Sequence, residues 1–399
     1  MRSLDQALAT LLSQTQSITD TQSVMLTDAV GRILAADITS PIDVPAYDNS
    51  QMDGYVGLAV EMNNAPEPMS VSQRIPAGHP GNPLQPGTVA RIFTGAPIPA
   101  GADAVIMQEQ AVAGEDGRVK FTEPAVSGQN IRPRAGDIRS GQVILNKGRR
   151  ICAADAGLCA SVGLLQLQVM RPLRVAVFSS GDELRQPGES LGFGQLFDSN
   201  RPMIISMAKR LGCEVLDMGC LPDSLAVTKE KLKRAADHCD AMLTCGGVSV
   251  GEEDHIKSAI SELGSLDLWK ISVKPGKPFA FGRVGRCVFM GMPGNPVAAW
   301  VTFALLVRPT LLNMSGALPS ASMPKGFRVP AGFDWPKPDA RQEFLRGWLD
   351  EDGLAQIHAR QNSSVLSSVT ECDGLVEIPA STKVGAGQFV RFIPYTELL

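Results

Sequence analysis

The sequence has few of the residue clusters from which metal centres and disulfide frameworks are built. Its 399 residues include eight cysteines, none in a Cys-x-x-Cys pair, and four histidines that stand apart from them. Zinc sites and disulfide scaffolds need closely spaced ligands or paired cysteines. The pattern therefore argues against both and favours scattered, mostly buried thiols in a reducing compartment.

Long hydrophobic runs and an excess of either charge are also lacking. The chain carries 37 basic and 41 acidic residues, a formal net charge of −4, which recommends neither nucleic acid nor an anionic membrane as a partner. No apolar run approaches the length of a membrane span, and Asp5 lies where a signal peptide would be apolar. We expect a soluble, cytoplasmic protein of two to four domains, with 44% apolar residues to fill their cores.

A glycine-rich stretch at residues 243–257, LTCGGVSVGEEDHIK, predicts a strand that turns into a helix. Gly246, Gly247 and Gly251 allow positive φ, so backbone N–H groups can converge on an anion near the helix N-terminus. The acidic residues 252–254 would repel a phosphate there unless a divalent cation, typically Mg²⁺, bridged carboxylate and phosphate. A tight strand-to-helix turn with an acidic helix start would show the same pattern.

The sequence pattern of the N-terminal half changes twice, from helical to alternating and back to helical. Helical patterns at residues 3–13 and about 28–36 are followed by short alternating segments between Gly- and Pro-rich turns, which indicates a small all-β unit. A further helical run at 153–162 resembles neither the β unit before it nor the alternating strands and helices after it. We therefore expect a discontinuous N-terminal linker domain, residues 1–44 and 138–172, with a mostly-β domain inserted at 45–137.

Residues 173–310 alternate strands with helices, which predicts a doubly wound α/β domain with a parallel sheet and helices on both faces. Ligands bind such sheets beyond the carboxyl ends of the strands. The polar turns fall there, and this agreement favours a binding site over independent structural turns. These turns are Asp182 and Glu183, Asp223, 246–254, 274–278 and 293–296.

The C-terminal part returns to short strands with glycine turns. Residues 308–324 are rich in turn formers and predict a linker. Residues 318–399 predict a compact, small β-barrel-like domain. The expected fold class is thus multidomain α/β plus β.

Two lysines of the α/β domain flank a Pro-Gly pair. This pair favours a type II turn with Gly276 at its positive-φ position, which could direct Lys274 and Lys277 at one anion; two solvated lysines on a loop are the alternative. Glu183, Asp223 and Asp254 would be metal ligands or acid–base groups if they converge. Taken singly, each is more typical of a helix cap or a surface acid.

Other candidate groups lie outside the α/β domain. Asp53, Thr94 and Asp137 belong to the N-terminal half, and nothing in the sequence groups them with the α/β site. Arg346 and the hydroxyls of residues 363–368 could bind an oxyanion in the C-terminal domain, although hydroxyl-rich turns are usually just turns.

Six motifs occur together in a familiar order: NSQMDGY, IFTGAPIPAGADAVIMQE, SSGDEL, GGVSVGEEDHIK, KPGKPFAFG and GMPGNPVAA. In this order and spacing the chain resembles the molybdopterin molybdenumtransferase family, which includes MoeA and the E domain of gephyrin, over essentially its whole length. The resemblance implies a four-domain homodimer that inserts molybdate into adenylated molybdopterin and hydrolyses the adenylate with release of AMP, assisted by Mg²⁺. It also implies a composite active site built by two chains.

The resemblance carries specific roles over to matching positions. It implies that polar groups of the cleft are Asp53, Thr94, Asp137 and Glu183, and that Asp223 and Asp254 lie nearest the metal. Groups that would hold the nucleotide phosphates are Gly246, Gly247, Ser249, Lys270 and Lys274. Molybdate would be received by Lys277, Pro278, Arg346 and Ser367 or Ser368, beside the turn that runs from Pro293 to Pro296.

Two positions depart from the family pattern. Gly136 stands where an acidic residue commonly precedes the equivalent of Asp137, which leaves the register of that turn open. Cys245 replaces a small hydroxyl residue, a change that a cradle of backbone N–H groups tolerates. Implied partners are the molybdopterin adenylyltransferase and molybdenum-enzyme chaperones, with no nucleic acid and no membrane.

Two other functions fit the same fold. A binding or scaffolding protein is one, since gephyrin relatives also anchor a receptor and fold does not fix function. However, the chain keeps Asp53, Glu183, Asp223, Asp254 and Lys274 and has no long tethering linker. Adenylyl transfer to molybdopterin is the other, and the extra N- and C-terminal domains argue against it.

Overall fold

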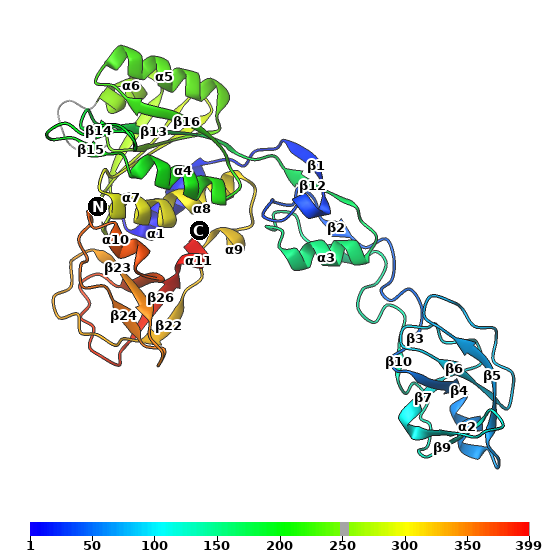
Figure 1. Ribbon diagram of the computed structural model, residues 1–399. Coiled ribbons are helices and arrows are strands. Elements are labelled where there is room, and N and C mark those ends of the chain that lie inside the picture. Colours follow the sequence, from blue (N-terminus) through cyan, green and yellow to red (C-terminus); the bar gives the residue numbers. More distant parts are fainter. Residues whose placement is uncertain (248–254, 399) are drawn as a thin grey trace. The chain divides into compact units, whose positions relative to one another are not determined.

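The computed structural model describes residues 1–247 and 255–398. The chain forms two compact units, drawn in Figure 1. The first comprises Met1–Ala36, Lys147–Cys152 and Leu167–Leu399, and the second comprises Asp37–Asn146 and Ala153–Gln166. The residues predicted at Ser249 and Asp254 lie outside the described part of the chain.

The first unit contains a six-stranded mixed sheet in the order β16-β13-β17-β21-β20-β18. Four neighbouring strands are parallel as predicted, whereas β20 runs antiparallel to both β21 and β18. The strands are β13 (Arg174–Ser180), β16 (Glu214–Leu221), β17 (Ala241–Cys245), β18 (Ser265–Lys270), β20 (Pro278–Val284) and β21 (Cys287–Met292). A parallel pair, β14 (Leu184–Arg185) and β15 (Leu196–Phe197), follows β13.

Helices cover both faces of this sheet, as Figure 1 shows. One face carries α5 (Leu225–His238) and α6 (His255–Leu263); the other carries α1 (Leu4–Gln14), α4 (Asn200–Arg210) and α7 (Pro296–Thr302). Alternate strand residues serve the two cores: Val177 and Leu243 pack on the α4 side, Phe178 and Met242 on the α5 side. Two-sided burial explains why these strands are apolar throughout rather than alternating.

The helix predicted at 3–13 is confirmed as α1. Ser3 caps it in a reciprocal arrangement, since its hydroxyl accepts the Gln6 amide at 3.1 Å and the Gln6 side chain accepts the Ser3 amide at 3.0 Å. The helix predicted at about 28–36 is wrong. Gly31 has φ +84°, and the buried residues Ile33 and Leu34 form bridges to Arg150 and Val169.

The linker predicted at 308–324 is also wrong in its first half. After α7 the chain passes through a π-helical turn, Phe303–Val307, into α8 (Arg308–Met314). Pro309 cannot donate to a carbonyl four residues back, and the wider turn just before it lets the helix continue.

The continuous helix Pro296–Met314 overturns one expectation about apolar runs. The helix has 19 residues and contains an 18-residue window with a mean hydropathy of 1.4, so it is long and apolar enough to cross a membrane, yet 94% of that window is buried inside the molecule. A core helix passes the same test of length and composition. Its apolar surface is covered by protein, so it offers no evidence of a membrane span.

The C-terminal part is a β domain with barrel-like closure. Its strands run in the order β19-β23-β25-β26-β22, with β24 beside β23. A bridge between Ala331, just after β22, and Ala355 in β24 joins the two edges. The strands are β19 (Val273–Lys274), β22 (Phe327–Pro330), β23 (Gln342–Leu349), β24 (Ala355–Ile357), β25 (Gly374–Ile378) and β26 (Phe389–Pro394). Short helices are α9 (Pro319–Ser322), α10 (Ser367–Thr370) and α11 (Tyr395–Leu398). The first unit also pairs β1 (Thr21–Met25) with β12 (Gln166–Met170).

The second unit is mostly β, as predicted for this region. Its main sheet runs β7-β4-β6-β5-β9-β8, and two strand pairs, β2 with β11 and β3 with β10, accompany it. The main-sheet strands are β4 (Gly54–Gly57), β5 (Met69–Ile75), β6 (Thr88–Ile92), β7 (Ala104–Met107), β8 (Ala111–Ala113) and β9 (Arg118–Phe121). The remaining elements are β2 (Ile38–Thr39), β3 (Asn49–Ser50), β10 (Ile131–Arg132), β11 (Val143–Leu145), α2 (Ala59–Asn64) and α3 (Ala153–Ser161).

One ion pair ties the start of the α/β domain to its sheet. Arg171 donates to both oxygens of Asp240 at 2.7 and 2.8 Å, and the Arg174 amide donates to the same carboxylate at 2.8 Å. Burial alone would raise the pKa of Asp240, but these hydrogen bonds outweigh it and hold that pKa below its usual value. The ionised carboxylate is therefore the form that the fold favours.

We predict that Asp240→Asn destabilises the first unit at pH 7, because Arg171 loses the carboxylate that binds it through two hydrogen bonds and keeps only the exposed Asp20 as an acidic partner. The expected loss is about 2 kcal/mol, or a Tm lower by about 5 °C. A lowered pKa contributes stability above the unfolded-state value near 4 and loses it as pH falls through the folded-state value. The Tm difference between Asp240→Asn and the parent should therefore shrink below about pH 4. Glu214→Gln, at the exposed pair with Arg174, is the control and should change Tm little; an equal loss in both variants would refute the assignment.

Candidate functional site

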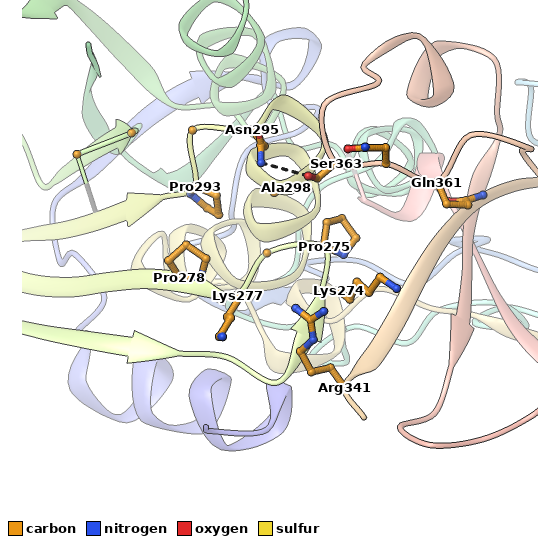
Figure 2. Close-up of a pocket in the computed structure, with 15 residues that line it drawn as sticks. Lys274, Pro275, Lys277, Pro278, Pro293, Asn295, Ala298, Arg341, Gln361 and Ser363 are labelled. Carbon is orange, nitrogen blue, oxygen red and sulfur yellow. Dashed lines mark hydrogen bonds between the residues drawn. The ribbon is translucent and has the colours of Figure 1, made fainter. Parts of the chain in front are cut away.

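A cavity of about 630 Å³ lies where the α/β sheet meets the C-terminal β domain within the first unit. Its walls come from the strand ends of the sheet, from the start of α7 and from loops of the β domain (Figure 2). The lining residues are Gly246, Gly247, Lys274, Pro275, Gly276, Lys277, Pro278, Pro293, Gly294, Asn295, Ala298, Arg341, Gln361, Asn362 and Ser363.

The topology brings the predicted turns to one edge of the sheet. β13, β16, β17 and β21 are parallel, so their carboxyl ends meet there. The first residue of antiparallel β20, Pro278, is paired with Lys270 at the end of β18 and lies at the same edge. The pocket therefore forms at the place that the alternating pattern predicted.

Glycines let the backbone form the pocket wall. Gly246 and Gly247 have φ of +87° and +65°, and the Gly246 amide donates to the Met292 carbonyl at 3.1 Å. A Cβ on Gly246 would lie 2.9 Å from the Ser180 carbonyl oxygen, and one on Gly276 would lie 2.7 Å from the Thr302 hydroxyl. Gly276 also has the predicted positive φ, at +117°.

Three cations line the pocket, and two of them have acidic partners. The Lys274 ammonium lies 3.0 Å from Glu343 Oε1 and 3.5 Å from Asp339 Oδ2, and the Arg341 guanidinium binds both oxygens of Asp339 at 2.9 Å. The contact from Lys274 to Glu343 is an ion pair without hydrogen-bond alignment. Lys277 makes no ion pair with any described residue. Among the described residues, three cations and two carboxylates leave one positive charge in excess.

Glu343 and Asp339 are fixed by further donors. Glu343 is completely buried, and its Oε2 accepts the Trp335 indole N–H at 2.8 Å and the Asp339 amide at 2.9 Å. The hydrogen bonds from Arg341 hold the pKa of Asp339 well below its usual range, with a smaller contribution from the charge of Lys274. The ionised Asp339 thus holds Arg341 in place, and the buried Glu343 lies against Lys274.

A loop of the β domain forms the opposite wall. Asn295, at the start of α7, donates to the Ser363 hydroxyl at 3.1 Å, as Figure 2 shows. Beneath the loop, the buried Arg346 donates to the carbonyls of Arg360 and Asn362 at 3.1 and 3.2 Å, and its backbone exchanges two hydrogen bonds with the Gln361 side chain. Burial lowers the pKa of Arg346.

Arg346, Ser367 and Ser368 do not line the pocket, although a role in receiving an oxyanion was predicted for them. Ser368 is buried and accepts Arg346 Nε at 3.1 Å, whereas Ser367 is exposed on α10 and accepts the Arg360 guanidinium at 3.3 Å. The Nη1 atom of Arg346 is buried and has no hydrogen-bond partner in the described part of the chain. In this structure Arg346 positions the loop that forms the wall.

Other predicted residues lie at the same sheet edge without lining the cavity. Glu183 follows β13 and is exposed, and Lys270 is exposed at the end of β18. Pro296 is the first residue of α7, next to lining residue Asn295. Asp223 follows β16, and its Oδ1 lies 2.8 Å from His255 Nε2.

In the second unit, Asp53 and Thr94 come together. The Thr94 amide and hydroxyl both donate to Asp53 Oδ1, at 2.8 and 2.9 Å. These bonds, the amide first, lower the pKa of Asp53. Asp137 is exposed in the turn after β10, and its amide donates to the Val44 carbonyl at 3.0 Å.

Sequence reasoning missed part of the pocket. Arg341, Gln361 and Asn362 lie in a domain whose distance from the α/β site cannot be read from local patterns. The nearest signal was the hydroxyl-rich stretch that begins at Ser363. Cys245, beside the glycine turn, is buried as expected, and burial raises the pKa of its thiol, so it is an unreactive packing residue.

Family models match most of the chain in three consecutive parts. Residues 2–163 match the MoeA N-terminal region (domain I and II), residues 176–313 match a "Probable molybdopterin binding domain", and residues 328–395 match the MoeA C-terminal region (domain IV).

Individual proteins match along their whole length. Molybdopterin molybdenumtransferase of Haemophilus influenzae is 39% identical and each chain is covered completely. Molybdopterin molybdenumtransferase 2 of Mycobacterium tuberculosis is 34% identical, with 92% of this chain and 93% of that protein covered. The crystal structure of the molybdopterin biosynthesis moeA protein of Pyrococcus horikoshii superposes with a TM-score of 0.85 at 28% identity, covering 99% and 100% of the two chains.

We predict that Arg346→Met loosens the loop at residues 360–362, because two loop carbonyls lose their buried charged donor. Loss of hydrogen bonds to a charged group, about 2 kcal/mol in all, should reduce protection from hydrogen exchange in this loop more than tenfold. Arg360→Met is the matched control, because the side chain of this exposed arginine has its polar contacts with Ser367 and Glu371 at the surface, among the residues that the structure describes. Unchanged exchange in Arg346→Met would show that the loop is held by other contacts.

Proposed function

Because the chain belongs to the MoeA family of molybdopterin molybdenumtransferases, we propose that it inserts molybdate into adenylated molybdopterin and hydrolyses the adenylate with release of AMP. Membership places it among enzymes of molybdenum cofactor biosynthesis. We propose AMP release and the roles of individual residues in addition to what family membership shows.

The observation that supports this proposal most directly is the charge of the pocket. Of the three lining cations, Lys277 has no acidic partner in the described part of the chain, so an incoming oxyanion meets one uncompensated positive charge. A tetrahedral dianion needs cationic and hydroxyl donors around it. Lys277 supplies the charge, and Ser363 and Asn295 supply uncharged donors.

The acidic groups at the sheet edge suit a Mg²⁺ ion that is shared with a phosphate. Mg²⁺ usually binds one or two carboxylates and completes its shell with phosphate oxygens and water. Among the described residues no group of three possible metal ligands occurs, and Asp223 engages His255 through one oxygen only. Asp223, with Asp254, would therefore hold Mg²⁺ only together with the substrate, where the ion would offset charge as the phosphoanhydride is cleaved.

The proposal includes partners and a compartment. We propose a cytoplasmic homodimer in which Asp53, Thr94 and Asp137 of one chain complete the active site of the other. The two hydrogen bonds that Thr94 donates to Asp53 keep this carboxylate ionised and oriented, which a polar group of the proposed cleft requires. A molybdopterin adenylyltransferase would deliver the intermediate, and chaperones of molybdenum enzymes would receive the product.

The direct test follows AMP release from adenylated molybdopterin by the purified protein with molybdate and Mg²⁺. We predict that Lys277→Ala raises the KM for molybdate about tenfold or more, since it removes a charge-assisted contact. Lys383→Ala, at an exposed lysine away from the pocket, should leave the KM unchanged. No AMP release by the parent protein would refute the proposed activity.

The role of Mg²⁺ is tested separately. EDTA should stop AMP release and added Mg²⁺ should restore it. Asp223→Asn should raise the Mg²⁺ concentration for half-maximal rate several-fold, because one carboxylate ligand is lost. Asp237→Asn, an exposed acid on α5, serves as control. An identical Mg²⁺ dependence in Asp223→Asn and the parent would remove Asp223 from the metal site.

A further inference from the structure

Two arginines stand side by side on one face of the main sheet of the second unit. Arg74 on β5 is paired directly with Arg91 on β6, and Arg91 is paired with Tyr55 on β4. Paired residues of neighbouring strands point to the same face. Tyr55, Arg91 and Arg74 therefore form a row across three strands.

Phe93 belongs to the same cluster, two residues after Arg91. The guanidinium carbons of Arg74 and Arg91 lie 4.5 and 4.8 Å from the centre of its ring, and Arg91 lies 5.2 Å from the centre of the Tyr55 ring. Such contacts stabilise a cation and fix the plane of its guanidinium. The aromatic rings thus orient the guanidinium groups of Arg74 and Arg91 without a carboxylate partner.

Neither arginine has a carboxylate within ion-pair distance among the residues that the structure describes. Arg91 donates to two neutral groups, the Gly54 carbonyl at 3.0 Å and the Gln108 side-chain oxygen at 2.5 Å. The charge of Arg91 reaches Asp53, but that carboxylate already accepts two hydrogen bonds from Thr94. Other arginines of this unit do have acids: Arg134 contacts Asp43 at 2.6 Å, and Arg118 contacts Asp116 at 3.7 Å.

Like charges placed opposite each other on neighbouring strands destabilise a sheet. An anion that binds from outside the chain would supply the missing negative charge. It would explain why Arg74 and Arg91 lie opposite each other without a carboxylate partner. Guanidinium forks match the oxygens of a phosphate group, and Arg74 is exposed while Arg91 and Phe93 are half-buried, so the face is accessible in the described unit.

We propose that Arg74, Arg91 and Phe93 form an anion-binding face for a phosphate ester or phosphoanhydride, beside Asp53 and Thr94. Phe93 orients the two guanidinium groups, and the arginines bind the phosphate oxygens. The inference rests on the proposed function in one respect: the anion would be the phosphoanhydride of the adenylated substrate. The inserted β domain would then bind the substrate through Arg74, Arg91 and Phe93 in addition to Asp53 and Thr94.

The test measures binding of inorganic pyrophosphate to the full-length protein by titration calorimetry. The parent for this test carries Lys277→Ala, which removes the unpaired cation of the other pocket. In that background Arg74→Gln and Arg91→Gln should each weaken binding about tenfold and reduce its dependence on salt concentration. Arg118→Gln removes one positive charge from the same sheet and should change the affinity by less than about twofold.

Phe93→Leu separates orientation from charge. It keeps both arginines, so it should weaken pyrophosphate binding by only about threefold. Circular dichroism and melting curves establish that each variant is folded, which Arg74→Gln should be because that side chain is exposed. Equal affinity in Arg74→Gln, Arg91→Gln and the parent, or an equal loss in Arg118→Gln, would overturn the proposal.

Kinetics distinguish this inference from the proposed function. If the wild-type protein releases AMP, Arg74→Gln and Arg91→Gln should raise the KM for adenylated molybdopterin; an unchanged KM would overturn the inference and leave the activity standing. If the wild-type protein releases no AMP but the two variants lose pyrophosphate binding, the anion-binding face stands and the proposed function fails.

Discussion

The contact between Lys274 and Glu343 is the constraint on which the pocket depends. Val273 and Lys274 form the short strand β19, which pairs in register with Gln342 and Glu343 of β23 and so joins the α/β sheet to the C-terminal β domain. Glu343 is fully buried there, and a buried carboxylate is tolerated only with a cation and further donors around it. Lys274 thus serves the junction, whereas Lys277 lines the pocket without an acidic partner among the described residues, which is why we propose it as the group that meets the anion. The chemistry of the site follows from this division between two lysines that are three residues apart.

Much of the site edge could be predicted from local patterns. Apolar strands followed by polar turns indicated a parallel sheet, and four neighbouring strands are parallel while β20 runs against its neighbours. The carboxyl ends of parallel strands must share an edge. Gly246, Lys274, Lys277 and Pro293 were placed correctly at this edge for that reason. Gly276 was identified from turn chemistry alone, and its φ of +117° agrees. These inferences rest on geometry within one domain, where sequence spacing and spatial position are closely related.

The errors arose where distant parts of the chain decide the local structure. Residues around Ile33 have helical periodicity but pair with Arg150 instead, and Pro309 lies inside a helix because a π-helical turn precedes it. The role of Arg346 in receiving an anion stays a prediction: in this structure it donates to the carbonyls of Arg360 and Asn362, and its buried Nη1 has no partner among the described residues. Periodicity and composition describe neighbours in sequence, so they could not reveal which loop of the β domain faces the sheet.

The loop above Arg346 has a consequence for ion selection. Two of its carbonyls accept hydrogen bonds from a buried guanidinium, so the wall would present the proposed oxyanion with a fixed surface that favours one charge and radius. Sulfate is markedly smaller than molybdate and would leave a gap against such a wall. Tungstate has nearly the same dimensions and the same charge as molybdate and would fit equally well. For the proposed substrate, this wall would therefore not distinguish tungstate from molybdate, and any preference between the two would have to arise outside the pocket.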